Sequence, residues 1–308
     1  MELCSLGSYL SVLQLAQALA IYADPFILTA ILGPSAVALY RAGTVLPSRI
    51  QPFVRVADQL HPFATVYHVS AQRARLRETL IRGTRYTLLL GILPCVVLGV
   101  FAEPIARFWL ARSLGHDYRL AAQVLACWSV VELLVYTAGA QWPVLLAMKK
   151  LGFAVRLSLP LAVLNLAASA CLVAWTPLGV VGAVVATIVI GVVSRPILIV
   201  YTARACGLGP MAYVCGAYLG PLVVLMALGA WATALLRLGV ADTLPGLAAA
   251  ILGTGVAWLA LTWCLGCNRE DRRSFRDLGR RLAEAILPPP CRVILSHAAA
   301  VDPKRRGP

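Results

Sequence analysis

Charge is scarce in this sequence, and acidic charge is the scarcest. Charged residues make up 13% of the 308 residues, whereas a soluble domain carries about 25%. Thirteen Asp and Glu residues stand against 27 Lys and Arg, a formal net charge of +14. Hydrophobic residues account for 60% of the chain, and the mean hydropathy is +0.81. This composition excludes a soluble globular domain and predicts an all-α integral membrane protein.

Short motifs of the common catalytic sites are also missing. The sequence has no Walker-type phosphate loop, no GxGxxG after a strand, no HExxH and no GxSxG. Its four histidines are scattered, and Cys264 and Cys267 form a single CxxC without a second pair. We therefore expect no enzyme, no cofactor and no metal site. Energy for any transport would come from an ion gradient, the membrane potential or the gradient of the substrate.

Long apolar runs dominate what is present. Eight runs are long enough to cross about 30 Å of hydrocarbon. They centre on residues 8–32, 35–64, 85–109, 119–148, 152–175, 178–203, 211–236 and 245–267. The sequence therefore predicts a polytopic bundle of about eight transmembrane helices.

Basic residues gather in alternate connections between these runs. The connection from Arg73 to Arg85 holds the densest group, and positive residues mark cytoplasmic loops. We therefore predict that both termini are cytoplasmic, and that the positive charge is a topology signal with no nucleic-acid partner. The stretch Ser70–Thr84 is predicted to be an amphipathic helix at the membrane interface, with Leu76 and Leu80 toward lipid.

Ionisable residues interrupt the first two apolar runs. Asp24 lies in the first run, and Arg41, Arg49, Arg55 and Asp58 lie in the second. Such residues cost several kcal/mol at bilayer depth, so they normally face a bundle interior or a water-filled cavity. We interpret this stretch as the functional part of the chain.

Polar residues of the second run share one helical face. At about 100° per residue, one arc of roughly 100° holds Arg41, Thr44, Ser48, Gln51, Arg55, Asp58 and Gln59. Arg49 departs from this arc, and Pro47 and Pro52 are expected to bend the helix. We interpret Arg41, Arg49 and Arg55 as a cationic cavity wall that holds an anion. Snorkelling of the arginines to an interface is the alternative.

Glu132 lies in the middle of the fourth run and is a third carboxylate of interest, beside Asp24 and Asp58. Two roles are open for it: neutralising one of the cavity arginines, or carrying a proton. For Asp24 the alternatives are pairing with an arginine and binding a coupling cation.

Several loose motifs resemble the C-terminal half of Wzx-type polysaccharide (O-antigen) flippases, which belong to the multidrug/oligosaccharidyl-lipid/polysaccharide exporter superfamily. The resemblance spans about residues 8 to 205. It is carried by Asp24, by Gly33-x-x-x-Val37-x-x-Tyr40-x-Ala42, by Pro62-x-x-x-Val66, by Arg82-x-x-Arg85-Tyr86-Thr87 before Pro94, by Phe101-Ala102-Glu103-Pro104-Ile105-x-x-Phe108-Trp109-Leu110, and by Pro177-Leu178-Gly179-x-x-Gly182-Ala183.

That resemblance implies one six-helix lobe of a MATE-like, two-lobed transporter followed by two extra helices. Residues 1–205 would form the lobe, 206–267 the extra helices, and 268–308 a basic cytoplasmic tail. It also implies transport of an undecaprenyl-diphosphate-linked oligosaccharide across the bacterial inner membrane for polysaccharide or lipopolysaccharide biosynthesis. The family has twelve to fourteen helices, so this chain would be an N-terminally truncated form or would pair with a second transporter lobe. A polysaccharide polymerase is a further expected partner.

Other functions fit the sequence less well. A lipid II flippase belongs to the same superfamily, as does a cationic-drug exporter, but a drug exporter should line its cavity with carboxylates rather than arginines. A membrane-embedded glycosyltransferase or phosphatase would need an acidic or His-bearing loop, and the longest loops here offer mainly arginine. A non-transporting subunit that only binds a partner in the bilayer is the remaining alternative.

Overall fold

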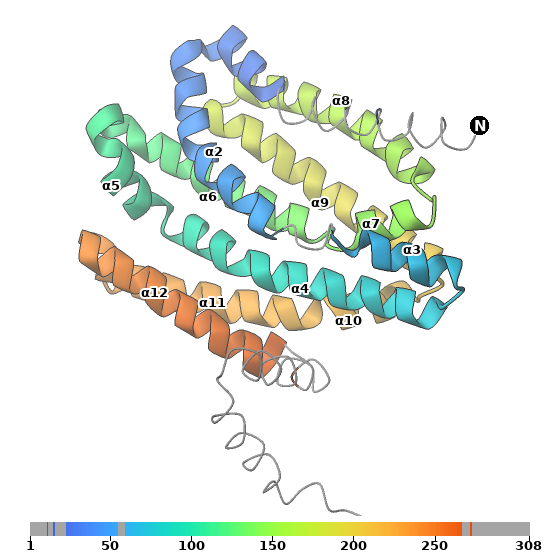
Figure 1. Ribbon diagram of the computed structural model, residues 1–308. Coiled ribbons are helices and arrows are strands. Elements are labelled where there is room, and N and C mark those ends of the chain that lie inside the picture. Colours follow the sequence, from blue (N-terminus) through green and yellow to red (C-terminus); the bar gives the residue numbers. More distant parts are fainter. Residues whose placement is uncertain (1–10, 12–14, 16–22, 55–58, 267–271, 273–308) are drawn as a thin grey trace, which may run out of the picture.

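The computed structural model describes residues 11, 15, 23–54, 59–266 and 272, and within these residues every regular element is a helix (Figure 1). Two of the predicted site residues, Arg55 and Asp58, lie outside the described residues, as does the predicted tail apart from Arg272. The proposed division into a lobe, two extra helices and a tail stays a prediction.

Six helical stretches in the described part of the chain are long and apolar enough to cross a membrane, so the prediction of eight spans is wrong. The difference lies in the first two runs. Helix Ala23–Leu32 is the described part of the first run and is too short. The second run forms α2 (Pro34–Val54), which Arg41, Arg49 and two internal prolines make too polar for the same criterion. The chain is a polytopic, all-helical membrane protein.

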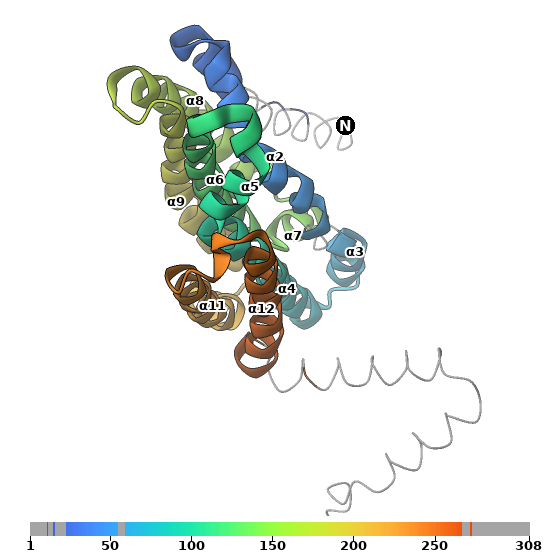
Figure 2. The same ribbon diagram turned by 90° about the vertical axis from the view of Figure 1, so that its left-hand side faces the viewer.

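The long helices pack side by side, each against the next, in a fixed order (Figures 1 and 2). This order is α8 (Gly152–Trp175), α9 (Val180–Ala205), α6 (Tyr118–Tyr136), α4 (Arg73–Val100), α11 (Leu219–Arg237) and α12 (Leu244–Leu261). A π-helical turn, Thr262–Gly266, extends α12. Both α2 and α5 (Ala102–Leu114) pack against α6, so α6 lies at the centre of the contacts.

Shorter helices complete the bundle near the first turns of α4. There α3 (His61–Val69) packs against α7 (Gln141–Ala147), and α10 (Pro210–Ala217) packs against both α4 and α9. Two single turns of 3-10 helix, Gly115–Asp117 and Val240–Asp242, connect longer helices.

The arginine-rich stretch Ser70–Thr84 is not an interfacial amphipathic helix, so that prediction is wrong. From Arg73 it forms the first turns of α4, a single 28-residue helix that continues to Val100. Leu76 is 4% exposed and Leu80 is 0% exposed, because both pack against residues of α7, α9 and α10. The leucines that were expected to face lipid are therefore part of the protein core.

Besides the second run, which contains α2 and α3, three of the predicted continuous helices are broken. The run 119–148 forms α6 and α7, separated by a turn at residues 137–140. The run 211–236 forms α10 and α11, separated at Tyr218, and the run 85–109 is divided at Phe101 between α4 and α5. In the first turn Gly139 has φ +41° and approaches α4 so closely that a Cβ there would lie 2.5 Å from Thr84 Cα. Only glycine satisfies both the backbone conformation and this contact.

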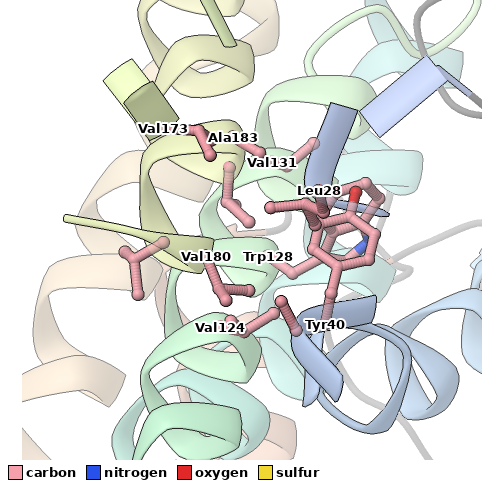
Figure 3. Close-up of a cluster of buried hydrophobic side chains, with 11 residues drawn as sticks. Leu28, Tyr40, Val124, Trp128, Val131, Val173, Val180 and Ala183 are labelled. Carbon is pink, nitrogen blue, oxygen red and sulfur yellow. The ribbon is translucent and has the colours of Figure 1, made fainter. Parts of the chain in front are cut away.

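Separate clusters of apolar side chains hold the bundle together. One joins helix Ala23–Leu32, α2, α6, α8 and α9 through eleven buried side chains, including Leu28, Tyr40, Trp128 and Val184 (Figure 3). Another joins α4, α11 and α12 through residues such as Leu89, Val224 and Leu247. Each hydrophobic side chain that is removed from water contributes about 1.5–3 kcal/mol, but a bilayer reduces this gain, so close packing matters more between spans.

Candidate functional site

The two described arginines of the predicted cavity wall are on the surface of α2. Arg41 and Arg49 are both exposed, whereas Tyr40, Gly43 and Pro47 on the other side of the helix are buried. At Gly43 the helix lies so close to α6 that a Cβ would lie 2.6 Å from a Val124 side-chain carbon. One face of α2 is thus fixed to the bundle, and the other presents two guanidinium groups.

The predicted polar arc of α2 does not form one continuous exposed face. Arg41 and Ser48 are exposed, but Thr44 is 7% exposed and Gln51 reaches toward α6. Part of the arc therefore lies on the exposed surface of α2, and part of it is buried in the bundle.

Glu132 lies inside the bundle, 4% exposed, near the end of α6. Its carboxylate accepts hydrogen bonds from Gln51 Nε2, at 3.1 Å to Oε2 and 3.3 Å to Oε1. A small cavity with room for about one water molecule adjoins the carboxylate. It is lined by Pro47, Ile50, Pro94, Cys95, Leu98, Ser129, Glu132 and Tyr136. Glu132 thus connects α6 to the helix that carries the arginines.

Asp24 is the second carboxylate behind α2 and is 1% exposed. The Tyr40 hydroxyl donates a hydrogen bond to its Oδ2 at 3.1 Å, and the Ser169 side chain of α8 lies beside the carboxylate. Its Oδ1 is buried and has no hydrogen-bond partner among the described residues. Tyr40 in turn packs edge-on against Trp128, with ring centroids 5.8 Å apart (Figure 3). Among the described residues no arginine forms an ion pair with Asp24, and Arg55 lies outside them, so both predicted roles of Asp24 stay predictions.

A second polar network, which the sequence did not indicate, lies where α6 and α10 end. The Tyr213 hydroxyl is 2.8 Å from Thr84 Oγ1, and the Gln141 amide donates to the Tyr218 hydroxyl at 2.9 Å. Tyr218 donates to the Thr137 carbonyl at 2.8 Å, which satisfies a backbone acceptor that the helix break exposes. These hydrogen bonds thus connect the break between α6 and α7 to the break between α10 and α11.

Two basic residues lie near this second network. Arg85 of α4 is 6% exposed, and its guanidinium donates to the Gly216 carbonyl through Nε at 3.0 Å and through Nη2. A cation at the C-terminus of a helix, here α10, is favoured by the helix dipole. Arg195, in the membrane-spanning α9, is half-buried and lies near Tyr218.

Burial raises the pKa of the Tyr213 phenol, while hydrogen bonds from neighbours such as Thr84 and Gln141 lower it. The phenol therefore stays neutral at physiological pH, and the network is made of uncharged hydroxyl and amide groups. Gly139 within an otherwise helical pattern is the kind of residue that marks a candidate break, but the predicted run 119–148 passed over it. Arg85 was assigned to the topology signal and to one of the motifs that carry the resemblance, and no structural role was predicted for it.

The fold and composition define the class, a polytopic membrane protein whose described spans are all helical. No protein-family model matches the chain, and no curated protein matches it at a significant level. Within the described residues, no group of three or more His, Cys, Asp or Glu side chains is placed to hold a metal ion. A more specific function must therefore rest on the site itself.

Proposed function

We propose that this chain moves a lipid-linked oligosaccharide across the bacterial cytoplasmic membrane, as one lobe of a polysaccharide flippase. The anionic group that it recognises is the diphosphate between lipid and sugar. The sugar crosses on the polar side while the polyprenyl chain stays in lipid. This function needs no catalytic group, so the chain is proposed to be a transporter and not an enzyme.

The observation that carries this proposal is the exposure of Arg41 and Arg49 on α2. This helix packs against α6, which belongs to a candidate membrane span, so its guanidinium groups lie on the surface of the bundle rather than in a distant loop. Guanidinium groups exposed to hydrocarbon cost several kcal/mol, and that cost is avoided when they face water or an anion. Arginine also binds phosphate oxygens through paired, charge-assisted hydrogen bonds.

The sign of the exposed charge separates this substrate from a cationic drug. The two buried carboxylates, Asp24 and Glu132, are 1% and 4% exposed, whereas the arginines of α2 are exposed. A surface of this kind attracts an anion and repels a cationic drug. A lipid II precursor also carries a diphosphate, so the arginines do not distinguish it from a polysaccharide precursor.

A translocation assay tests the proposal. The chain, together with any polytopic protein that co-purifies with it, is reconstituted in liposomes with a fluorescent polyprenyl-diphosphate oligosaccharide, and the fraction that reaches the outer leaflet is measured over time. We expect translocation that falls at least tenfold in Arg41→Gln and Arg49→Gln. The control is Arg112→Gln, which removes an exposed positive charge from the end of α5.

Two outcomes would contradict the proposal. Translocation that is equal in all three variants would show that the α2 arginines do not bind the substrate. No translocation by the wild-type chain, even when it is reconstituted with the polytopic protein that co-purifies with it, would identify the chain as a non-transporting subunit.

A further inference from the structure

Basic side chains gather at the end of the bundle where α4 begins (Figure 1). The start of α4, the end of α7 and the end of α9 lie together there, because their apolar residues share one buried cluster. Of the basic residues on these segments, five are exposed and Arg77 is half-buried. The group consists of Arg73, Arg75, Arg77, Lys149, Lys150 and Arg204.

Two of these cations are held at the end of α9. The Arg77 guanidinium donates through Nε to the Cys206 carbonyl at 3.0 Å, and the Lys150 ammonium donates to the neighbouring Ala205 carbonyl at 3.3 Å. Lys150 is itself fixed to α9, because its carbonyl accepts a hydrogen bond from the Tyr201 hydroxyl at 3.1 Å. Two different segments therefore bring positive charge to the same helix end.

The end of α9 does not balance this charge. A helix dipole places about half an elementary negative charge at the C-terminus, whereas Arg77 and Lys150 bring two full positive charges there, and Arg204 lies in the same last turn. Glu78 is the one acid of α4, a helix that the structure describes in full, and it pairs with Arg82 at 2.7 Å. Like charges that are held together repel one another, so a bound anion would stabilise this end of the bundle.

The two cations have hydrogen-bond donors to offer such an anion. A guanidinium and an ammonium each carry several N–H groups, and one bond to a carbonyl leaves the others. Nη2 of Arg77 lies beside Gly207, where a Cβ would come within 2.8 Å of it. Gly207 is exposed and has no side chain to cover the guanidinium. Phosphate oxygens suit this arrangement, because arginine binds them through charge-assisted hydrogen bonds.

Apolar surface continues from the cations along α8, and it indicates what carries the phosphate. This helix is a candidate membrane span that begins at Gly152, directly after the basic turn. Phe153 is 39% exposed and stacks on Tyr201, with ring centroids 4.3 Å apart. Farther along the helix, Leu159 and Val163 are 39% and 57% exposed. Aromatic side chains between cations and an exposed apolar surface are typical of the headgroup level of a bilayer.

We propose that this end of the bundle binds an anionic phospholipid, with the phosphate at Arg77, Lys150 and Arg204 and the acyl chains along α8. Basic pockets between membrane-spanning helices bind anionic headgroups in this way. The bound lipid joins α4, α8 and α9, since each contributes or adjoins one of the cations. The site is separate from the arginines of α2 and does not rest on the proposed function.

Native mass spectrometry of the full chain, with lipid added in detergent, tests the site. We expect dioleoylphosphatidylglycerol to be retained and dioleoylphosphatidylcholine, which has the same acyl chains but no net charge, to be released. The double variant Lys150→Gln, Arg204→Gln should retain the anionic lipid about twentyfold less. The matched control Arg112→Gln, Arg237→Gln removes two exposed charges at the other end of the bundle and should match wild type (Figure 1).

Arg204→Gln alone serves as the test if the double variant does not fold, because this side chain is exposed; its retention of the anionic lipid should fall about fivefold. Retention that is unchanged in this variant, or equal in the double variant and the control, would overturn the proposal. Equal retention of the two lipids would do the same. Displacement of the bound lipid by inorganic phosphate would show an anion site without acyl-chain contacts, which also contradicts it.

Discussion

The bundle contains two buried polar networks, and they differ in the charge of the groups that they bury. The network at the helix breaks joins the neutral side chains of Thr84, Gln141, Tyr213 and Tyr218 through several mutual hydrogen bonds. The network behind α2 is centred on the carboxylate of Asp24, which accepts a hydrogen bond from Tyr40 and has no ion pair among the described residues. A hydrogen-bonded network of neutral groups fixes a structure, whereas a buried charge without a countercharge is kept where it serves a function.

The difference also separates the roles of arginine in the chain. Arg85 is buried and bonded to the Gly216 carbonyl at the end of α10, so its charge stabilises a helix end. Arg41 and Arg49 are exposed on α2. The same residue type therefore serves structure in one region and, in our proposal, substrate binding in the other.

The largest effect on stability is expected at Gly139. Changing it to Ala places a Cβ 2.5 Å from Thr84 Cα and strains a backbone with φ +41°. We expect a loss of about 3 kcal/mol or more in the free energy of unfolding, measured by denaturant titration in detergent. Gly115→Ala is the control, because Gly115 has φ +56° but no neighbour within 4 Å. Equal losses in both variants would show that the close contact with α4 is unimportant.

Loss of the Arg85 cap should have the next largest effect. Arg85→Gln removes a charge-assisted hydrogen bond to a backbone carbonyl, for which we expect a cost of about 2 kcal/mol. The matched variant Glu78→Gln breaks the exposed pair of Glu78 and Arg82, whose atoms are 2.7 Å apart, and should cost about 0.5 kcal/mol or less. Thermal unfolding of both variants in the same detergent checks this order. An Arg85 variant as stable as wild type would contradict the assigned role of this cap.

Removing one hydroxyl from the network at the helix breaks should have a smaller effect. Tyr213→Phe deletes the phenol oxygen that bonds Thr84 and Gln141, and we expect a cost of about 1 kcal/mol. The ring is retained, so packing against Tyr218 is unchanged. If the variant is indistinguishable from wild type in a denaturant titration, the network contributes nothing beyond its apolar contacts.

The smallest effect on the free energy of unfolding is expected at Asp24, in contrast to the network at the helix breaks. Asp24→Asn keeps an oxygen that accepts from Tyr40 and adds an NH2 group on the side where Oδ1 has no partner among the described residues. The free energy of unfolding should therefore change by less than about 0.5 kcal/mol, since no interaction is lost. A large destabilisation in thermal unfolding would show that the charge at Asp24 is structural, and it would remove the contrast between the two networks.

Sequence reasoning predicted the long apolar helices well where the pattern was uninterrupted. The run 152–175 is α8, and the run 178–203 corresponds to α9. It failed where small residues hide a break: the turn before α7 is made of Thr, Ala and Gly, which hydropathy does not separate from helix. Fold class thus depends on overall hydropathy, whereas the number of helices depends on where the breaks lie. In a sequence this apolar, hydropathy is the strong signal and the breaks are weakly marked.

The role of the candidate site stays a prediction. Burial of Asp24 and Glu132 agrees with the cost of charge at bilayer depth, whereas that cost does not by itself predict the exposure of Arg41 and Arg49. The partners could not be predicted, because Tyr40 and Gln51 meet the carboxylates through helix packing that residue spacing does not specify. For the same reason the sequence placed Thr44 and Gln51 on the cavity face, although both turn toward α6.

The central claim, that the exposed face of α2 is a water-accessible binding site for a lipid diphosphate, can be tested directly. Arg49→Cys is introduced into a chain whose native cysteines are replaced by Ser, and its reaction with a charged, membrane-impermeant thiol reagent is followed in proteoliposomes. We predict rapid modification that undecaprenyl diphosphate slows and that an uncharged polyprenol does not. An introduced thiol that is unreactive, or that the diphosphate lipid fails to protect, would contradict the account.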